Sequence, residues 1–367
     1  MKKVVFWWNI PCAGMINVLK SYAQDVDKEA IVVTGKLSEF RKAMGWDDGG
    51  KLFENHIILS DDEWHEEGKK ILDRYTDRIH LFNGISYPDR MRKLIDYAIE
   101  NNIAFANMSE AYFNLEKGFR KLLKTIFMSI VLPYRIRRVS ENSLGVMCLS
   151  GSSDRDLNQF RNFGFRMVFP FGYYTDEKFE FHYSQAGDGK LHVLCPGLIE
   201  HYKGVDILVK ALAIVRDKGV QNFVCHITGK GSKQDYIKNL ISQLGIEDRV
   251  KLEGVLDSKR YSTLLSQIDI LVAPGRVEPW GIRINEAIQR GNVVVVSDGI
   301  GAHCLIKESE GGDVFKAGNP SDLADKLMPF LISQDTLDTA KKKNLEYRAK
   351  ISCQAQAFRL HDIISQL

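Results

Sequence analysis

Glu278 and Glu286 stand eight positions apart around a Pro-Trp-Gly segment. The segment follows the apolar run 270–273 and opens an amphipathic stretch that stops at Gly291. A helix beginning near Gly281 would present backbone N–H groups without intrahelical acceptors, and its dipole would add partial positive charge. Such a helix start suits a diphosphate, and carboxylates on either side of it can accept hydrogen bonds from the paired hydroxyls of a sugar and a ribose.

The first turn of that helix is expected to hold Gly281, Ile282 and Arg283. Taken alone, two glutamates at this spacing are more often solvated charges beside a helix. The Pro-Gly pair before them and the Glu-Pro-Trp-Gly sequence leading into the helix favour a ligand site instead, in which Arg283 adds a cation.

A second cation, Lys203, ends the segment Pro-Gly-Leu-Ile-Glu-His-Tyr-Lys-Gly over 196–204. Lys203 would hold a diphosphate as a point charge, and the alternative is a solvated lysine before a helix. Two glycine turns, at Gly229 and Gly254, follow further apolar runs. A lone glycine pair is a weak signal, so the order of the motifs along the chain carries the argument.

Short apolar runs alternate with amphipathic stretches along the chain, which predicts parallel sheets covered by helices. A polar, glycine-containing linker over 182–190 separates two such series. We expect one domain over 1–185, a second over 190–336, and a helix over 337–367 that packs back toward the first domain. Strands are expected at 4–8, 30–34, 56–59, 79–82, 103–106, 147–149 and 167–168 in the first domain, and at 191–195, 223–228, 250–252, 270–273 and 293–297 in the second.

Together these motifs resemble those of the retaining glycosyltransferases of family 4, also called glycosyl transferases group 1. In that family the first glutamate of the E-x7-E signature faces the transferred sugar and the second binds the ribose, which implies these roles for Glu278 and Glu286. The resemblance also implies that Lys203 binds the donor diphosphate and that the loops at Gly229 and Gly254 flank the nucleotide base. It is specific over 191–330 and only general over 1–185.

The family usually has an arginine where this chain has Leu198. We expect Arg283 or Arg276 to replace that cation. The glycine turns over 298–301 and 310–312 also resemble later turns of the family.

The resemblance implies an α/β fold of the GT-B type, in which two Rossmann-like doubly wound domains face each other across a cleft. It further implies a retaining hexosyltransferase that moves a sugar from a nucleotide-sugar donor to a hydroxyl of a glycan or lipid-linked acceptor. Capsule, O-antigen or exopolysaccharide biosynthesis would suit this reaction. Neither a cofactor nor a metal ion is expected, because the DxD pattern at 154–156 is interpreted as a helix start. Lys203, Arg283 and the helix N-terminus would then stabilise the departing diphosphate.

Two alternatives use the same fold. One is a sugar-nucleotide epimerase, which would alter its sugar without an acceptor, and the other is a nucleotide-sugar-binding protein without turnover. A dehydrogenase is disfavoured, because no expected strand is followed by a G-x-G-x-x-G motif with an acidic residue about 20 positions later.

Residues for the acceptor are harder to choose. Gly14 follows the first expected strand, where the family's loop approaches the reaction centre. Glu110 could position an acceptor hydroxyl or accept its proton; alternatively, Ser109 caps a helix and Glu110 favours its first turn. His80 and Asn83 end another strand and could contact the ligand, although a lone histidine on a strand is more often structural.

Residues 112–140 carry seven basic residues and one acidic residue, interleaved with apolar ones. Such a segment can lie on an anionic membrane surface, and the alternative is a core-packed helix with a solvated basic face. Over the whole chain, 50 basic and 47 acidic residues are too balanced to favour nucleic acid binding. The six scattered cysteines lack CxxC spacing and favour reduced thiols, and so a cytoplasmic protein, peripheral on the inner face of the membrane if 112–140 binds lipid.

Overall fold

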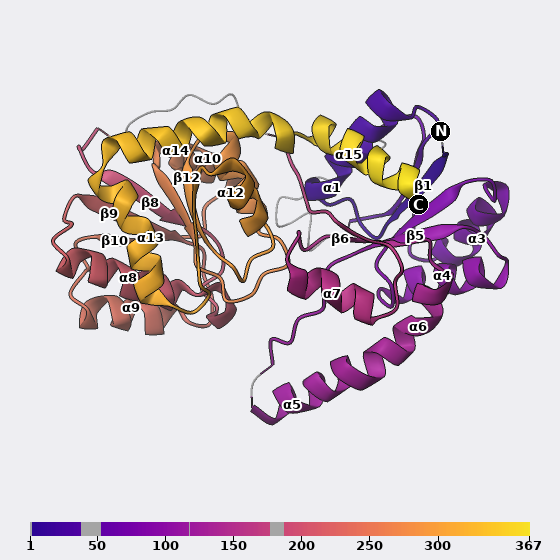
Figure 1. Cartoon of the computed structure of the whole chain (residues 1–367), viewed down its shortest axis with the longest axis horizontal. Helices are drawn as coiled ribbons and strands as arrows, with labels where there is room; N and C mark the ends of the chain where they lie inside the picture. Colours follow the sequence, from indigo (N-terminus) through magenta and orange to yellow (C-terminus); the bar gives the residue numbers. More distant parts are fainter. Residues whose placement is uncertain (1, 38–52, 117, 177–186) are drawn as a thin grey trace. The chain divides into compact units, whose positions relative to one another are not determined.

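The computed structural model describes residues 2–37, 53–116, 118–176 and 187–367 (Figure 1). Two compact units account for the chain. The N-terminal unit contains Met1–Thr175 together with Ser352–Leu367, and the C-terminal unit contains Asp176–Ile351. Most of the expected linker over 182–190 lies outside the described residues.

In the described part of the N-terminal unit, seven parallel strands form one sheet in the order β3-β2-β1-β4-β5-β6-β7. The central strand β1 is buried along its whole length, as expected for a sheet covered on both faces. The strands are β1 Val4–Trp8, β2 Ile31–Gly35, β3 His56–Leu59, β4 Ile79–Asn83, β5 Phe105–Ser109, β6 Val146–Cys148 and β7 Val168–Pro170.

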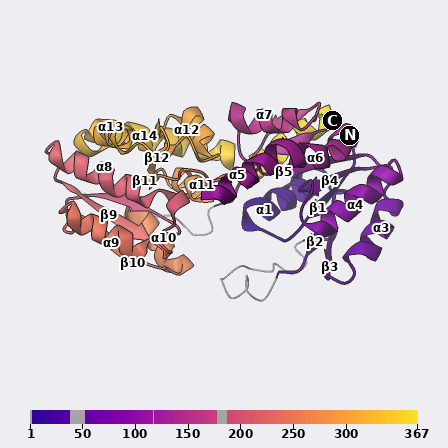
Figure 2. The same cartoon turned by 90° about the horizontal axis from the view of Figure 1, so that it is seen from below.

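Helices cover both faces of this sheet. Val5 and Trp7 of β1 share a hydrophobic core with residues of α3, α4, α6 and α7, whereas the Phe6 ring on the other face lies 5.1 Å from that of Tyr22 beside α1. Figure 2 shows these helices and the sheet from a second direction. The helical segments are α1 Ala13–Ser21, the π-helical turn η1 Tyr22–Val26, α3 Trp64–Arg74, α4 Asp89–Glu100, α5 Gly118–Ile126, the π-helical turn η2 Phe127–Val131, α6 Leu132–Asn142, α7 Asp154–Asn162 and α15 Cys353–Gln366.

The described C-terminal unit has a six-stranded parallel sheet in the order β10-β9-β8-β11-β12-β13. Its strands are β8 Leu191–Cys195, β9 Phe223–Thr228, β10 Val250–Gly254, β11 Ile270–Ala273, β12 Val293–Ser297 and β13 Gly312–Phe315. Its helical segments are η3 His201–Lys203, α8 Val205–Asp217, α9 Gln234–Gln243, α10 Ser258–Gln267, α11 Ile282–Gln289, α12 His303–Ser309, α13 Pro320–Ile332, α14 Gln334–Tyr347 and η4 Arg348–Ile351.

The sixth strand, β13, corrects the prediction of five strands, which treated 310–312 as a glycine turn. Gly312 is instead the first residue of β13 and pairs with Val294. A Cβ at this position would lie 1.8 Å from the Val294 carbonyl oxygen, so the glycine allows close strand pairing.

Two other predictions need correction. The strand expected at 103–106 begins at Phe105 and runs to Ser109, because the chain leaves α4 through Asn102 at a positive φ of 56°. The C-terminal segment from 337 is not one helix but α14, η4 and α15, with Ser352 capping the last by accepting a bond from the Ala355 amide. Only α15 belongs to the N-terminal unit.

His80 is buried in β4 and has a structural role. The Trp7 indole donates to His80 Nδ1 at 2.9 Å, and His80 Nε2 lies 3.0 Å from the Tyr75 carbonyl oxygen. The neutral ring satisfies both contacts, whereas a proton on Nδ1 would remove the acceptor of Trp7. Burial accordingly lowers the pKa of His80 to about 4.

We expect this histidine to make the stability of the protein pH-dependent. Because its folded pKa lies below its usual value, its contribution is fully present above about pH 6.5 and is lost as the pH falls toward 4. The full loss corresponds to about 3 kcal/mol of unfolding free energy. Urea unfolding across this range should show a steeper pH dependence for the wild type than for His80→Gln, and equal slopes would contradict the assignment.

Candidate functional site

The structure brings Lys203 and Glu278 together, although 75 positions separate them in the chain. Lys203 ends η3, just before α8, and Glu278 lies between β11 and α11. The Lys203 Nζ is 2.7 Å from Glu278 Oε1, and the two side chains are 22% and 25% exposed. A cation and a carboxylate are therefore paired and accessible after the carboxyl ends of two adjacent strands, β8 and β11.

The backbone at Glu278 is held from both sides by the loop over 299–301. The Glu278 amide donates to the Gly299 carbonyl at 3.0 Å, and the Gly301 amide donates to the Glu278 carbonyl at 3.1 Å. A Cβ on Gly299 would lie 2.3 Å from the Arg276 carbonyl oxygen, so glycine is required for this approach. Sequence reasoning identified 298–301 only as a turn and missed its role in positioning Glu278.

The N-terminus of α11 is formed as expected. Gly281 is its cap residue at a φ of 96°, Ile282 and Arg283 begin the helix, and the first turn contains no acidic residue. The Trp280 indole donates to Asn285 Oδ1 at 2.9 Å and anchors the entry to the helix. The amides at this helix start can thus donate hydrogen bonds to an anion.

Arg283 and Glu286 form an ion pair on the surface of α11. Arg283 Nη1 lies 2.9 and 2.8 Å from the two carboxylate oxygens of Glu286, and its guanidinium carbon is 4.3 Å from the centre of the Tyr261 ring. Burial and the Glu286 charge together raise the pKa of Tyr261. Arg283 therefore orients Glu286 in this structure. The side chain of Leu198, which stands where an arginine was expected, is 51% exposed.

Arg276 also forms hydrogen bonds, which the sequence did not predict. Its guanidinium donates to both carboxylate oxygens of Asp206 at 2.8 and 2.7 Å and to the His201 carbonyl at 2.7 Å. Burial raises the pKa of Asp206, but the hydrogen bond and charge of Arg276, with the charge of Lys210 and a backbone hydrogen bond, lower it, and the net shift is downward. The Arg276 amide donates to the Tyr202 carbonyl at 2.7 Å, so this residue ties the loop before Glu278 to the loop that carries Lys203.

Gly229 and Gly254 lie together beside the 196–204 segment. The Gly229 amide donates to the Gly254 carbonyl at 2.6 Å, and both residues have positive φ, 97° and 69°. A Cβ on Gly229 would stand 1.9 Å from the Gly197 carbonyl oxygen. The end of β10 and the loops that follow β8 and β9 therefore meet at this point, and Gly229 leaves no room for a side chain.

Glu110 and Gly14 belong to the N-terminal unit. Glu110 follows β5 and accepts a 2.9 Å hydrogen bond from the Tyr173 hydroxyl. No helix starts there, so the alternative in which Ser109 caps a helix is wrong. Gly14 lies inside α1 rather than in a loop, and its carbonyl accepts from the Tyr174 amide at 2.6 Å. Both residues thus contact the segment 173–174 after β7.

Cys12, the residue before α1, is not a nucleophile at neutral pH. Burial raises the pKa of its thiol to about 11, with the Glu110 charge acting in the same direction. A thiol with that pKa stays protonated, so Glu110 is the stronger candidate for proton transfer in this unit.

Comparison with known proteins finds a family match over the C-terminal unit. Residues 176–351 match the family model described as glycosyl transferases group 1. The chain is 30% identical over 150 residues to an uncharacterised glycosyltransferase of Methanocaldococcus jannaschii, covering 41% of this chain and 38% of that protein. It is 30% identical over 145 residues to the alpha-D-kanosaminyltransferase of Streptomyces kanamyceticus, covering 39% and 37% respectively. The chain thus matches less than two fifths of the length of these relatives.

Solved structures resemble the whole chain. The Anabaena HepE protein in complex with UDP and glucose has a TM-score of 0.66 at 16% identity, with 100% of both chains covered. The lipopolysaccharide outer core galactosyltransferase WaaB has a TM-score of 0.68 at 14% identity, again with 100% of both chains covered. At these identities the likeness concerns the fold.

Proposed function

Because residues 176–351 belong to the glycosyl transferases group 1 family and the chain has the GT-B fold, we propose that this protein transfers a sugar from a nucleotide-sugar donor. The observation that carries the proposal is the Lys203–Glu278 ion pair, in which 2.7 Å separates Nζ from Oε1. Glu278 lies just before Gly281, the cap residue of α11. A cation, a carboxylate and free helix amides are the three groups that a sugar diphosphate needs.

In this proposal each donor residue has one task. Lys203 leaves Glu278 to bind the diphosphate, and the carboxylate is then free to accept hydrogen bonds from the sugar hydroxyls. Glu286, oriented by Arg283, binds the ribose hydroxyls, and the loops at Gly229 and Gly254 flank the base. The charge that develops on the leaving diphosphate is stabilised by Lys203 and the α11 amides, without a metal ion.

The transferred group is a hexose-type sugar, and its anomeric configuration is retained. The bond from the anomeric carbon to the diphosphate breaks, a bond to the acceptor hydroxyl forms, and Glu110 positions that hydroxyl or takes its proton. The acceptor is a glycan or a lipid-linked sugar, and the reaction serves cell-envelope polysaccharide synthesis in the cytoplasm. The name of the related kanosaminyltransferase supports transfer of a sugar group.

Donor binding is tested by thermal unfolding with UDP-, GDP- and ADP-sugars. We expect one nucleotide class to raise Tm, by about 5–10 °C at a hundredfold excess over Kd, since a ligand that binds only the folded state stabilises it by about 2.7 kcal/mol. Glu286→Ala should shrink this shift, because it removes the carboxylate that binds the ribose. Glu346→Ala, an exposed glutamate in the same unit, is the matched control and should keep the full shift.

The absence of a shift with every donor would contradict the proposal, as would an undiminished shift in Glu286→Ala.

The two alternative functions can be told apart by the products that each would release. An epimerase would release an altered sugar nucleotide without acceptor, and a binding protein would give the Tm shift but no turnover. A transferase should release the nucleoside diphosphate at a rate that rises with added acceptor.

A further inference from the structure

A row of exposed apolar side chains follows one side of the long helical segment in the N-terminal unit. The segments α5, η2 and α6 succeed one another without a break from Gly118 to Asn142. The row recurs at intervals of three, four, seven and eight residues, which places it on one helix face. We call it the apolar stripe; it consists of Phe119, Leu122, Leu123, Ile126, Phe127, Ile130, Val131 and Tyr134.

These side chains are not the ones that hold the helix to the protein. Leu132, Ile136 and Val139 of α6 enter the core of the N-terminal unit, and Met128 packs against that core. No residue of α5 is buried, and Phe119, Ile130 and Tyr134 of the stripe are 71%, 67% and 81% exposed. One face of the segment therefore serves the fold, and much of the second apolar face stays exposed within the part of the chain that the structure describes.

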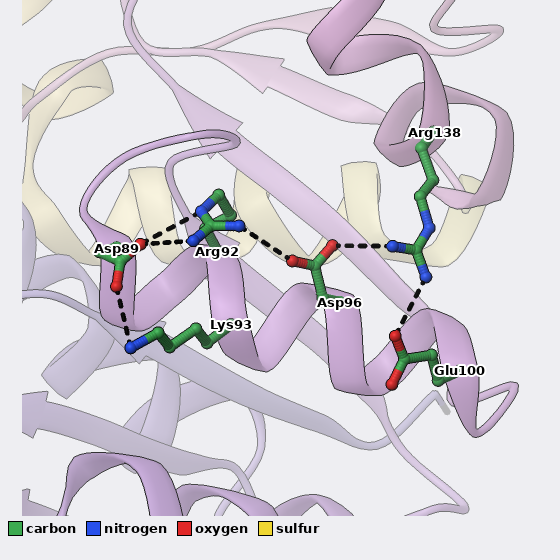
Figure 3. A network of polar contacts seen from close by, with 6 residues as sticks. All are labelled: Asp89, Arg92, Lys93, Asp96, Glu100 and Arg138. Carbon is green, nitrogen blue, oxygen red and sulfur yellow. Dashed lines mark hydrogen bonds and ion pairs between the residues drawn. The ribbon is translucent and has the colours of Figure 1, made fainter.

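Ion pairs hold α6 to its neighbour α4. Arg138 Nη1 and Nη2 lie 3.4 and 3.3 Å from Asp96 and Glu100, and Asp96 also contacts Arg92, at 3.4 Å (Figure 3). With the buried residues of α6, this network fixes the C-terminal half of the segment. The stripe thus extends along a helix that is anchored at one end and exposed along α5 (Figure 1).

The helical segment that carries the apolar stripe is also positively charged. No acidic residue occurs from Gly118 to Ser140, whereas six basic residues do. Among the described residues, Arg120, Lys121 and Lys124 form no ion pair, and the Arg135 guanidinium lies 5.5 Å from the centre of the Phe127 ring at the edge of the stripe. The surface therefore combines a continuous apolar face with cations that form no ion pair among the described residues.

We propose that the apolar stripe lies in the surface of a membrane that contains anionic lipids. The 16 residues from Phe119 to Tyr134 form a face about 24 Å long, which fits a plane better than a pocket. The apolar side chains would enter the acyl boundary while Arg120, Lys121, Lys124 and Arg135 contact lipid phosphates. The helix lies on the membrane and does not cross it, and none of the helices within the described ranges has the length and hydropathy that a bilayer crossing requires.

Vesicle flotation with the full-length protein tests this inference independently of sugar transfer. The wild type should float with vesicles of phosphatidylcholine and phosphatidylglycerol and stay at the bottom with phosphatidylcholine alone. Phe119→Ser/Ile130→Ser should lose flotation, because it removes two exposed apolar anchors. Arg120→Gln/Lys121→Gln/Lys124→Gln should lower the partition coefficient on the order of 100-fold, at low salt, since each cation near an anionic surface contributes separately.

Two control variants remove the same kinds of side chain from surfaces outside the apolar stripe. Ile332→Ser/Phe358→Ser removes two exposed apolar side chains outside the stripe, and Lys238→Gln/Lys251→Gln/Lys342→Gln removes three exposed cations. Both should float like the wild type, with all variants showing an unchanged Tm. The proposal is overturned if the wild type does not float, if the stripe variant still does, or if light scattering shows a dimer that the stripe variant converts to a monomer.

Discussion

Glu278→Ala should lower kcat by about 100- to 1,000-fold, the usual loss when one group that stabilises a transition state is removed. The substitution removes the carboxylate that we assign to the sugar and leaves Lys203 without its 2.7 Å partner. The measurement is release of nucleoside diphosphate at saturating donor and acceptor. Binding of the donor should weaken less than turnover, because Lys203 and the α11 amides remain.

Three variants make this result specific. Glu346→Ala removes an exposed carboxylate of the same unit and should keep wild-type kcat. Lys203→Met should also reduce turnover, and the double variant should lose less than the product of the single losses, because the two side chains act as a pair. Near-normal turnover of Glu278→Ala with an unchanged Tm would refute the assignment of this site.

The sequence predicts the donor-side elements well and their mutual contacts poorly. Four of the five strands expected in the C-terminal unit have the predicted bounds, because buried parallel strands are short, continuous apolar runs. The motifs also indicated Lys203 and Glu278 separately. Their ion pair depends on where two distant loops meet, and no local pattern encodes that distance.

The same limit applies to residues whose contacts no local pattern shows. Arg276 was considered a candidate phosphate cation, but its two bonds to Asp206 are visible only in the folded chain. Gly299 appeared to be an ordinary turn glycine, although the close approach to Arg276 requires it. Ser109 looked like a helix cap because serine before glutamate often is one, yet β5 extends through it and no helix follows.

The amphipathic segment shows a different limit. Its composition predicts both a buried and a membrane-facing helix, because both have an apolar face. The structure separates the two sets of apolar residues: Leu132 and Ile136 are in the core, while Phe119 and Ile130 are exposed. Periodicity alone could not divide them, because both sets recur at helical spacing.

Gly204→Ala should destabilise the protein by about 3–5 kcal/mol, a magnitude typical of strain at a special backbone position combined with a clash. Gly204 has a φ of 69° between Lys203 and α8, and a Cβ there would lie 2.0 Å from the Pro274 carbonyl oxygen. Because that atom belongs to the backbone before Glu278, relief of the clash must separate the two loops. We therefore expect urea unfolding to show the loss of stability, and folded Gly204→Ala to lose turnover as well.

Gly219→Ala is the matched control, since it lies just beyond the other end of α8 and also has a positive φ, 91°. A Cβ at Gly219 would meet nothing within 4 Å, so this variant carries only the left-handed strain of about 1–2 kcal/mol. The difference between the two variants measures the contact of Gly204 with Pro274. Equal destabilisation, or full activity in Gly204→Ala, would mean that this contact does not hold Lys203 and Glu278 in place.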